Sequence, residues 1–280
     1  MRLLTFMARR FVAGDNLEEA VVQVKRLNSQ GIKATLDNLG EECQSREQAM
    51  AARDEYVRML GRIAEEGLDC NVSLKLTQFG MGLDLGFCRD NLFRVLDEAK
   101  KHGNFVRIDM EGTGYTDQTL DLFRQAKARY PKVGIVIQAM LRRSEKDISD
   151  LVKEGVCVRL CKGAYKEPPE LAFPDKKDVN SSYDRLAELL LQAPNPAYAT
   201  HDDERIAFAA QAAERAGVAK NRYEIQMLYG LRAKRWKELA AAGHVVRVYT
   251  PYGTHWFPYF YRRVRERKEN LMFVLRNFFE

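Results

Sequence analysis

Tyr259, Arg262, Arg263 and Glu266 combine an aromatic ring with three ionic groups at spacings of three and four residues. These spacings place the four side chains on one face of a helix, where core residues normally lie. Two neighbouring guanidinium groups can bind one carboxylate through several charge-assisted hydrogen bonds. The pattern is typical of either a carboxylate-binding face or a solvated basic face.

A second group of polar side chains recurs in the short β-type runs of the chain. One phase of each run is apolar and suits packing against helices, whereas the other phase is charged or amide-bearing. The polar phase contains Lys75, Arg107, Asp109, Gln138, Arg159, Gln226 and Arg247, and His201 ends its own run in a matching position. Because burying such groups unpaired is costly, we expect them to contact one another or a polar ligand. They would form an internal salt-bridge network or a pocket at the C-terminal mouth of a barrel.

The segment Val158–Tyr165 leaves a strand through a basic, glycine-containing turn. Lys162 and the backbone N–H groups of this turn could meet an anion such as a flavin diphosphate. Thr200 and His201 end another strand, and Asp202 is expected to cap the following helix beside a hydrogen-bonded His201.

Several other kinds of site are not indicated. The four His residues show no metal-ligand spacing, so no metal site is predicted. The five Cys include no CxxC pair, which argues against a disulfide scaffold or a zinc ribbon. The glycines of Gly80–Gly86 lack the spacing and the acidic partner of a dinucleotide-binding loop. Neither a GxxxxGK[ST] motif nor a GxSxG motif occurs.

Eight units of a strand followed by a helix must position these residues. We predict strands at Ile32–Leu36, Asn71–Leu76, Phe105–Met110, Gly134–Ala139, Val156–Cys161, Pro196–His201, Tyr223–Leu228 and His244–Tyr249. Helices are predicted at Ser45–Glu66, Asp90–Lys101, Thr116–Ala128, Glu145–Lys153, Asn180–Leu191, Asp203–Ala216 and Ala233–Ala242.

This order predicts an α/β protein with a distorted (βα)8 barrel of the TIM type. An extra N-terminal helix, Asn16–Asn28, precedes the first strand, and a C-terminal helical region, Phe257–Phe278, would lie over the barrel mouth. A doubly wound sheet is the alternative. Such a sheet usually begins with a Gly-rich turn after its first strand, where this chain has Gly40 alone.

The composition suits one soluble domain. The 280 residues carry 45 Lys+Arg against 39 Asp+Glu, a net charge of +6, and 46% of them are hydrophobic, which excludes overall disorder. No apolar run approaches the ~18 residues of a membrane span and no signal peptide is found, so a cytoplasmic protein is expected. Without repeats or linkers, residues 1–280 should form a single domain in which residues 1–29 are an N-terminal helical extension.

Together, these motifs resemble those of proline dehydrogenase, a flavin enzyme that occurs as a monofunctional bacterial protein or as one domain of the bifunctional proline utilisation protein. In the family's order, the motifs are Arg10–Gly14, Ser73–Leu76, Arg107–Glu111, Val136–Ala139, Val158–Tyr165, Ala199–His201, Gln226–Gly230, Arg247–Gly253 and the face from Tyr259 to Glu266. The resemblance implies a distorted (βα)8 barrel with non-covalent FAD. It also implies oxidation of L-proline to Δ1-pyrroline-5-carboxylate by hydride transfer from C5 to FAD, the first step of proline catabolism to glutamate.

The same resemblance implies partners and a location. Electrons would pass to a membrane quinone, so a cytoplasmic protein would have at most peripheral contact with the inner face of the membrane. Pyrroline-5-carboxylate dehydrogenase would use the product, and nucleic acid would not be a partner.

Finally, the resemblance implies roles for individual residues. Asp109, beside the substrate amine, and Arg159, near the flavin N5 edge, would be catalytic. The substrate would contact Lys75, Leu228, Tyr249, Tyr259, Arg262, Arg263 and Glu266, the two arginines clamping the carboxylate and Glu266 holding one of them. FAD would contact Met110, Gln138, Arg159, Lys162, Gly163, Ala164, Tyr165, Thr200, His201 and Gln226. Because hydride loss from C5 requires a neutral amine, we expect Asp109 to be tied to Lys75 or to an arginine.

Two other classes of function compete with this interpretation. A Schiff-base lyase or aldolase on the same barrel would use Lys75 or Lys162 as its nucleophile. A nucleic-acid-binding module would use the basic C-terminal helix, although Glu266 and Glu269 dilute its positive charge.

Overall fold

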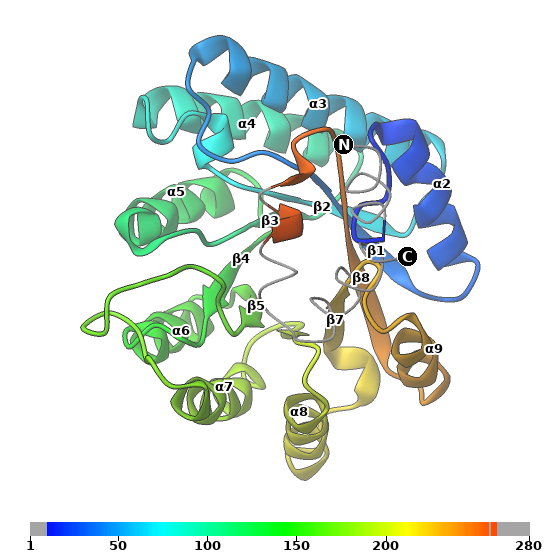
Figure 1. Cartoon of the computed structure of the whole chain (residues 1–280), viewed down its shortest axis with the longest axis vertical. Helices are drawn as coiled ribbons and strands as arrows, with labels where there is room; N and C mark the ends of the chain where they lie inside the picture. The colour runs from blue at the N-terminus through cyan, green and yellow to red at the C-terminus, as the bar shows by residue number, and fades with distance from the viewer. Residues whose placement is uncertain (1–9, 258, 262–280) are drawn as a thin grey trace, which may run out of the picture.

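The computed structural model describes residues 10–257 and 259–261, and within them eight parallel strands form a closed barrel (Figure 1). The strands are β1 (Lys33–Asn38), β2 (Cys70–Leu74), β3 (Val106–Ile108), β4 (Val133–Gln138), β5 (Cys157–Cys161), β6 (Ala197–Ala199), β7 (Glu224–Leu228) and β8 (Val245–Tyr252). Each strand pairs with the next in the chain, and β1 pairs with β8 to close the barrel. The predicted (βα)8 barrel is thus confirmed, and the doubly wound alternative is wrong.

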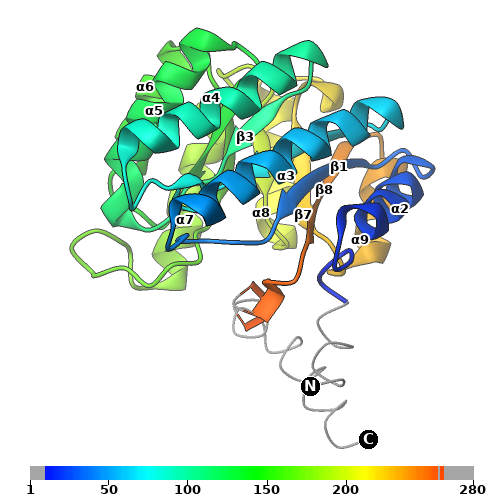
Figure 2. The ribbon, with the colours of Figure 1, turned by 90° about the horizontal axis from the view of Figure 1, so that it is seen from above.

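Helices surround the barrel in the same order (Figures 1 and 2). They are α2 (Leu17–Asn28), α3 (Arg46–Glu65), α4 (Leu85–Lys101), α5 (Thr116–Arg129), α6 (Ser144–Lys153), α7 (Lys176–Leu190), α8 (Asp203–Arg215) and α9 (Ala233–Ala241). Short 3-10 helices lie at η1 (Thr77–Phe79), η2 (Thr113–Tyr115) and η3 (Lys220–Arg222). Within the described part of the chain, none of the helices has the length and apolar character that a membrane span requires.

Side-chain caps determine where several helices begin. Asn16, Ser45, Asp84 and Asp202 each accept a hydrogen bond from a backbone N–H in the first turn of α2, α3, α4 and α8, respectively. Such caps satisfy N–H groups that have no partner inside the helix. The cap at Asp84 explains why α4 begins at Leu85, five residues before the predicted start at Asp90.

Other element boundaries also differ from the sequence prediction. Strands β3 and β6 contain only three residues each, and α7 begins at Lys176 rather than Asn180. Strand β8 continues past Tyr249 to Tyr252, because β1 pairs with it as far as Asn38. The limits of the strands depend on pairing between strands, which local sequence does not report.

The apolar phase of the strands packs against the helices as predicted. Val72, Leu74 and Ile108 belong to one large buried cluster that also contains Tyr56 and Leu60 of α3. The opposite phase of the strands is therefore left to line the barrel interior.

The N-terminal segment 10–14 crosses to the end of β8. Ala13 N–H donates to the Pro251 carbonyl at 2.8 Å, and Gly253 N–H donates to the Gly14 carbonyl at 2.9 Å. Phe11 is fully buried and packs against Phe260, with ring centroids 5.9 Å apart. Residues 256–257 and 259–261 are helical, and the remainder of the predicted C-terminal helical region lies outside the described residues.

Candidate active site

A cavity of about 1470 Å³ opens at the C-terminal ends of the strands. Every predicted site residue that the structure describes lines it: Lys75, Asp109, Met110, Gln138, Arg159, Lys162, Gly163, Ala164, Tyr165, Thr200, His201, Gln226, Leu228, Tyr249 and Tyr259. Arg262, Arg263 and Glu266 lie outside the described residues. The barrel brings these residues together because parallel strands all end at the same rim.

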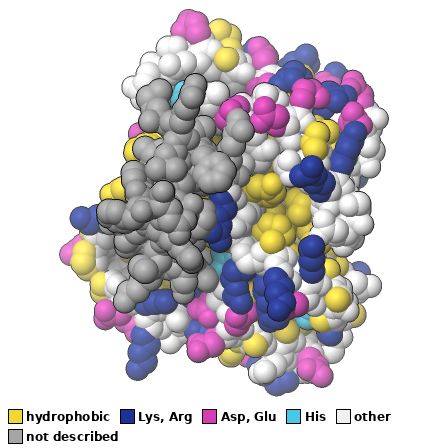
Figure 3. Space-filling view, turned by 45° about the vertical axis from the view of Figure 1, so that its right-hand side comes forward, with side chains coloured by type: hydrophobic (Ala, Val, Ile, Leu, Met, Phe, Trp, Pro, Cys, Tyr) yellow, Lys and Arg dark blue, Asp and Glu magenta, His cyan; other side chains and the backbone are white. Residues whose placement is uncertain are grey.

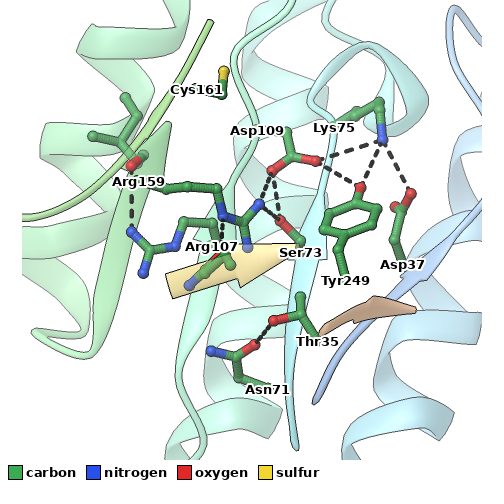
Figure 4. Close-up of polar contacts among 12 residues, drawn as sticks. Thr35, Asp37, Asn71, Ser73, Lys75, Arg107, Asp109, Arg159, Cys161 and Tyr249 are labelled. Atoms are coloured by element: carbon green, nitrogen blue, oxygen red, sulfur yellow. Dashed lines mark hydrogen bonds and ion pairs between the residues drawn. The ribbon is translucent and has the colours of Figure 1, made fainter. Parts of the chain in front are cut away.

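Asp109 is the centre of the buried polar cluster in Figure 4. Its carboxylate accepts hydrogen bonds from Arg159 Nη1 at 3.0 Å, from Ser73 Oγ at 2.5 Å and from the Tyr249 hydroxyl at 2.8 Å. Lys75 Nζ lies 3.6 Å from the same carboxylate. The expectation that Asp109 is tied to Lys75 or to an arginine is confirmed, since it contacts both.

Asp37, a residue that the sequence analysis missed, lies on the other side of Lys75 (Figure 4). Its carboxylate is 3.2 Å from Lys75 Nζ and is fully buried. A signal was available, because Asp37 continues the polar phase of Lys33 and Thr35, opposite the apolar phase of Ala34 and Leu36. The predicted strand ended at Leu36, one residue too early, and so excluded it.

The two carboxylates keep Lys75 protonated. Burial lowers the pKa of Lys75, but the negative charges of Asp37 and Asp109 outweigh this effect and raise it. Burial raises the pKa of Asp109, but the charges of Lys75 and Arg159 lower it overall. An ammonium group is not a nucleophile, so this cluster disfavours the Schiff-base alternative at Lys75.

The polar lumen residues fall into two layers. Lys75, Asp109 and Arg159 line the cavity, whereas Arg107 and Arg247 lie nearer the N-terminal ends of the strands. Arg107 Nη1 donates to the carbonyls of Ile135 and Cys157, and Arg247 forms an ion pair with Glu224. The expected mouth pocket and the expected internal network both exist, one above the other.

Lys162 occupies another part of the cavity wall. Its ammonium group donates to Asn180 Oδ1 and to Asp202 Oδ2, both at 2.6 Å. The neighbouring Gly163 has φ +109°, and a Cβ there would lie 2.4 Å from Met140 Sδ, so this turn requires glycine. The ion pair with Asp202 also disfavours Lys162 as a Schiff-base nucleophile.

The Thr200–Asp202 segment has the expected local structure. Asp202 caps α8, and His201 Nε2 accepts a hydrogen bond from the Leu228 N–H at 3.1 Å. This bond joins the ends of two neighbouring strands at the cavity rim. In the described residues, no group of three or more His, Cys, Asp or Glu side chains is arranged to hold a metal ion.

Glu111 is a buried acid beside the site that the sequence analysis quoted without a role. It accepts hydrogen bonds from the Thr77 N–H at 3.1 Å and from Thr77 Oγ1 at 2.5 Å. Its backbone carbonyl also accepts a bond from Gln138 Nε2 at 2.9 Å. Burial raises the pKa of Glu111 from 4.5 to about 7, against the lowering effect of the Thr77 bonds.

This raised pKa predicts a pH-dependent loss of stability. As the pH rises from 4.5, the unfolded chain releases the Glu111 proton before the folded chain does, so the free energy of unfolding falls until about pH 7. Between pH 4.5 and 7, the free energy of unfolding of the wild type should fall by roughly 3 kcal/mol relative to that of Glu111→Gln. Denaturant unfolding at several pH values measures the difference.

Glu98→Gln is the control with the opposite sign. The bond from Lys101 lowers the pKa of Glu98, so the wild type should gain stability relative to this variant as the pH rises through the acidic range. A constant difference between the wild type and Glu111→Gln from pH 4.5 to 7 would contradict the assignment of the raised pKa.

The fold and the cavity together define a barrel enzyme whose charged cluster lies at the C-terminal ends of the strands. A family model described as proline dehydrogenase matches residues 20–276. The chain therefore belongs to the proline dehydrogenase family. Membership supports an oxidoreductase that oxidises proline and acts in proline catabolism.

Individual relatives agree with the family match. The chain is 45% identical to proline dehydrogenase 1 of Bacillus subtilis subsp. natto over 96% of this chain and 89% of that protein. It is 38% identical to the proline dehydrogenase of Deinococcus radiodurans, with the same shares covered. A crystal structure of proline utilization A from Bdellovibrio bacteriovorus, inactivated by N-propargylglycine, superposes with a TM-score of 0.87 at 27% identity. That match covers 94% of this chain and 33% of the other.

Proposed function

We propose that this protein oxidises L-proline to Δ1-pyrroline-5-carboxylate with a non-covalently bound FAD and passes the electrons to a quinone. The observation that carries the proposal is the charged cluster of Lys75, Asp109 and Arg159 at one large cavity, in a chain of the proline dehydrogenase family. The cluster supplies charges for a zwitterionic substrate, and the cavity supplies room for a dinucleotide.

The cavity contains donors that suit a flavin dinucleotide. Arg159 is buried, and its Nη2 atom has no hydrogen-bond partner among residues 10–257 and 259–261. A buried donor of this kind calls for an acceptor, such as the nitrogen and oxygen atoms at the polar edge of an isoalloxazine ring. Lys162 uses two of its three N–H groups on Asn180 and Asp202, which leaves one for an anion such as the diphosphate.

The remaining cofactor contacts are proposed from the cavity lining. They are Met110, Gln138, Gly163, Ala164, Tyr165, Thr200, His201 and Gln226. When bound, FAD would accept the hydride that leaves C5 of proline. The residues of this chain would bind both molecules, align them and exclude water.

The substrate side of the cavity combines apolar walls with the charged cluster. Leu228, Tyr249 and Tyr259 line the cavity and would enclose the apolar ring of proline. Lys75 and Asp109 would lie beside the amine. The cationic Lys75 disfavours a protonated substrate amine, while Asp109 is largely committed to Arg159, Ser73 and Tyr249 and is less available to stabilise one. A neutral amine has the lone pair that assists hydride loss.

The carboxylate clamp rests on the family resemblance alone. Arg262 and Arg263 would hold the substrate carboxylate, and Glu266 would hold one of these arginines. All three lie outside the described residues. In the sequence, Arg262 and Arg263 follow Tyr259, which lines the cavity, by three and four residues.

A quinone acceptor calls for a surface that can approach a membrane. Leu83, Leu85, Leu171, Phe257 and Tyr261 are exposed large hydrophobic residues, and each lies in a segment that follows the C-terminal end of a strand. Figure 3, in which the side of the barrel with α2 and α9 comes forward, also shows an apolar patch with Lys and Arg side chains around it. Apolar and basic side chains together suit an anionic lipid surface. They support a cytoplasmic protein with peripheral contact at the inner face of the membrane.

Two further parts of the proposal concern the organisation of the protein and its product. Residues 1–280 would act as one barrel domain, in which residues 1–29 form an N-terminal extension. Pyrroline-5-carboxylate dehydrogenase would use the product, and nucleic acid is not proposed as a partner.

An absorbance scan with and without L-proline tests the proposed function. The purified protein, with added FAD if required, should show a flavin spectrum that bleaches when L-proline is added without oxygen. D-proline provides a control for specific binding in the cavity. A protein that fails to bind FAD, or a bound flavin that L-proline leaves oxidised, would contradict the proposal.

A further inference from the structure

A chain of buried polar contacts runs from the lower layer of the barrel to Arg159. Arg247 forms two hydrogen bonds to the Glu224 carboxylate, both at 2.8 Å. Glu224 Oε2 accepts a bond from Gln226 Nε2 at 2.7 Å, and Gln226 Oε1 accepts a bond from Arg159 Nε at 2.6 Å. Glu224 and Gln226 lie two residues apart on β7, so both side chains point into the lumen.

The donors and acceptors on either side of Gln226 allow only one orientation of its amide group. An ionised carboxylate only accepts hydrogen bonds and a guanidinium group only donates them. The amide NH2 of Gln226 must therefore face Glu224, and its oxygen must face Arg159. The reversed amide would place two acceptors together at Glu224 and two donors together at Arg159.

The ionised state of Glu224 is well supported. Burial raises the pKa of Glu224, but the charge and hydrogen bonds of Arg247 outweigh this effect and lower it to about 2. Glu224 is therefore an acceptor throughout the neutral range. Arg247 also donates a hydrogen bond to the Ala34 carbonyl at 2.6 Å, which anchors this series of polar contacts to β1.

The orientation of Gln226 determines which nitrogen of Arg159 remains available. Gln226 binds Nε, while Asp109 and Ser73 bind Nη1. The Nη2 atom is then the one without a partner among the described residues. A planar guanidinium that is held at two of its three nitrogens has a defined direction.

We propose that Glu224 is a positioning residue: it orients the Gln226 amide, which holds the Arg159 guanidinium in place at the wall of the cavity where the flavin would bind. The inference rests on the proposed flavin function. Glu224 does not line the cavity, so it acts only through its neighbours.

Two other roles for Glu224 must be separated from this one. Glu224 could affect the flavin simply as a remote negative charge, or it could only stabilise the barrel by pairing with Arg247. Removing a remote negative charge would raise the flavin midpoint potential, because reduction adds negative charge. Releasing Arg159 would lower the potential, because a positive charge is no longer held at the flavin.

The test compares Glu224→Gln with the double variant Glu224→Gln/Arg247→Gln. An amide at position 224 can donate or accept, so residue 224 no longer fixes the Gln226 amide, and only the bond from Arg159 Nε then favours its orientation. The double variant removes the charges of Glu224 and Arg247 together, so the remote electrostatic effect of Glu224 on the flavin is cancelled. It also leaves no unpaired buried arginine, so it can be tested even if Glu224→Gln alone fails to fold. Thr35→Val is the matched control, because it removes a buried hydrogen bond to Asn71 in the lumen that does not involve Arg159.

Both Glu224 variants should bind FAD roughly tenfold more weakly to the apoprotein and have a lower midpoint potential than the wild type. In an Arg159→Met background, the double substitution should change neither quantity. Wild-type potential and affinity in a folded double variant would overturn the inference, and so would an equal loss in the Arg159→Met background. A wild type without FAD binding would instead contradict the proposed function itself.

Discussion

Asp109→Asn should lower kcat/KM for proline by roughly 100-fold or more. Asparagine has nearly the same size but carries no charge, so Arg159 and Lys75 lose the carboxylate that joins them at 3.0 and 3.6 Å. Breaking a buried charge pair on one side costs about 3–5 kcal/mol because the other charge remains buried. The loss should appear in steady-state assays with an artificial electron acceptor.

Asp147→Asn is the matched control for this experiment. Asp147 is also buried and pairs with Arg143 at 2.7 Å, but it lies on α6 and does not line the cavity. It should change kcat/KM little. If Asp109→Asn keeps kcat/KM within about threefold of the wild type, the central role of Asp109 is wrong.

Gly230→Ala should be the most destabilising single-methyl substitution near the cavity. Gly230 has φ +76°, and a Cβ there would lie 1.5 Å from the Arg10 carbonyl oxygen. The N-terminal segment must therefore move away, which exposes the fully buried Phe11. Adding the cost of a left-handed alanine to the loss of Phe11 burial gives roughly 3–5 kcal/mol. Denaturant unfolding measures this change.

Gly217→Ala is the control that separates the cost of a left-handed alanine backbone from the cost of the clash with the Arg10 carbonyl. Gly217 has φ +68°, close to that of Gly230, but a Cβ there would meet no atom within 4 Å. This control should lose only about 1–2 kcal/mol. Equal losses in the two variants would show that the close approach of the N-terminal segment to Gly230 does not contribute.

Site residues could be predicted from the sequence where a charged residue occupies the phase of a strand that faces the lumen. Lys75, Asp109 and Arg159 were recognisable in this way, and all three line the cavity. Asp37 was missed because the predicted first strand stopped at Leu36, whereas β1 continues to Asn38 through its pairing with β8. Glu224 was also missed. It shares the lumen-facing phase of β7 with Gln226, and that phase was the signal that could have identified it.

Partnerships within the cluster required the three-dimensional structure. The strand pattern indicates that Asp109 pairs with Lys75 or with an arginine, and the structure shows contacts with both. The separation of Arg107 and Arg247 from the cavity was also not predictable. It depends on the stagger of neighbouring strands in a closed barrel.

The sequence by itself determined the barrel, the order of its strands and most of the polar side chains that face the lumen, because alternation and helical periodicity are local properties of the chain. Only the tertiary structure decided which carboxylate meets which cation, how far each strand extends and why Gly230 must lack a side chain. Those features arise from contacts between residues such as Asp37 and Lys75, or Arg10 and Gly230, that are far apart in the chain and meet only in the folded barrel.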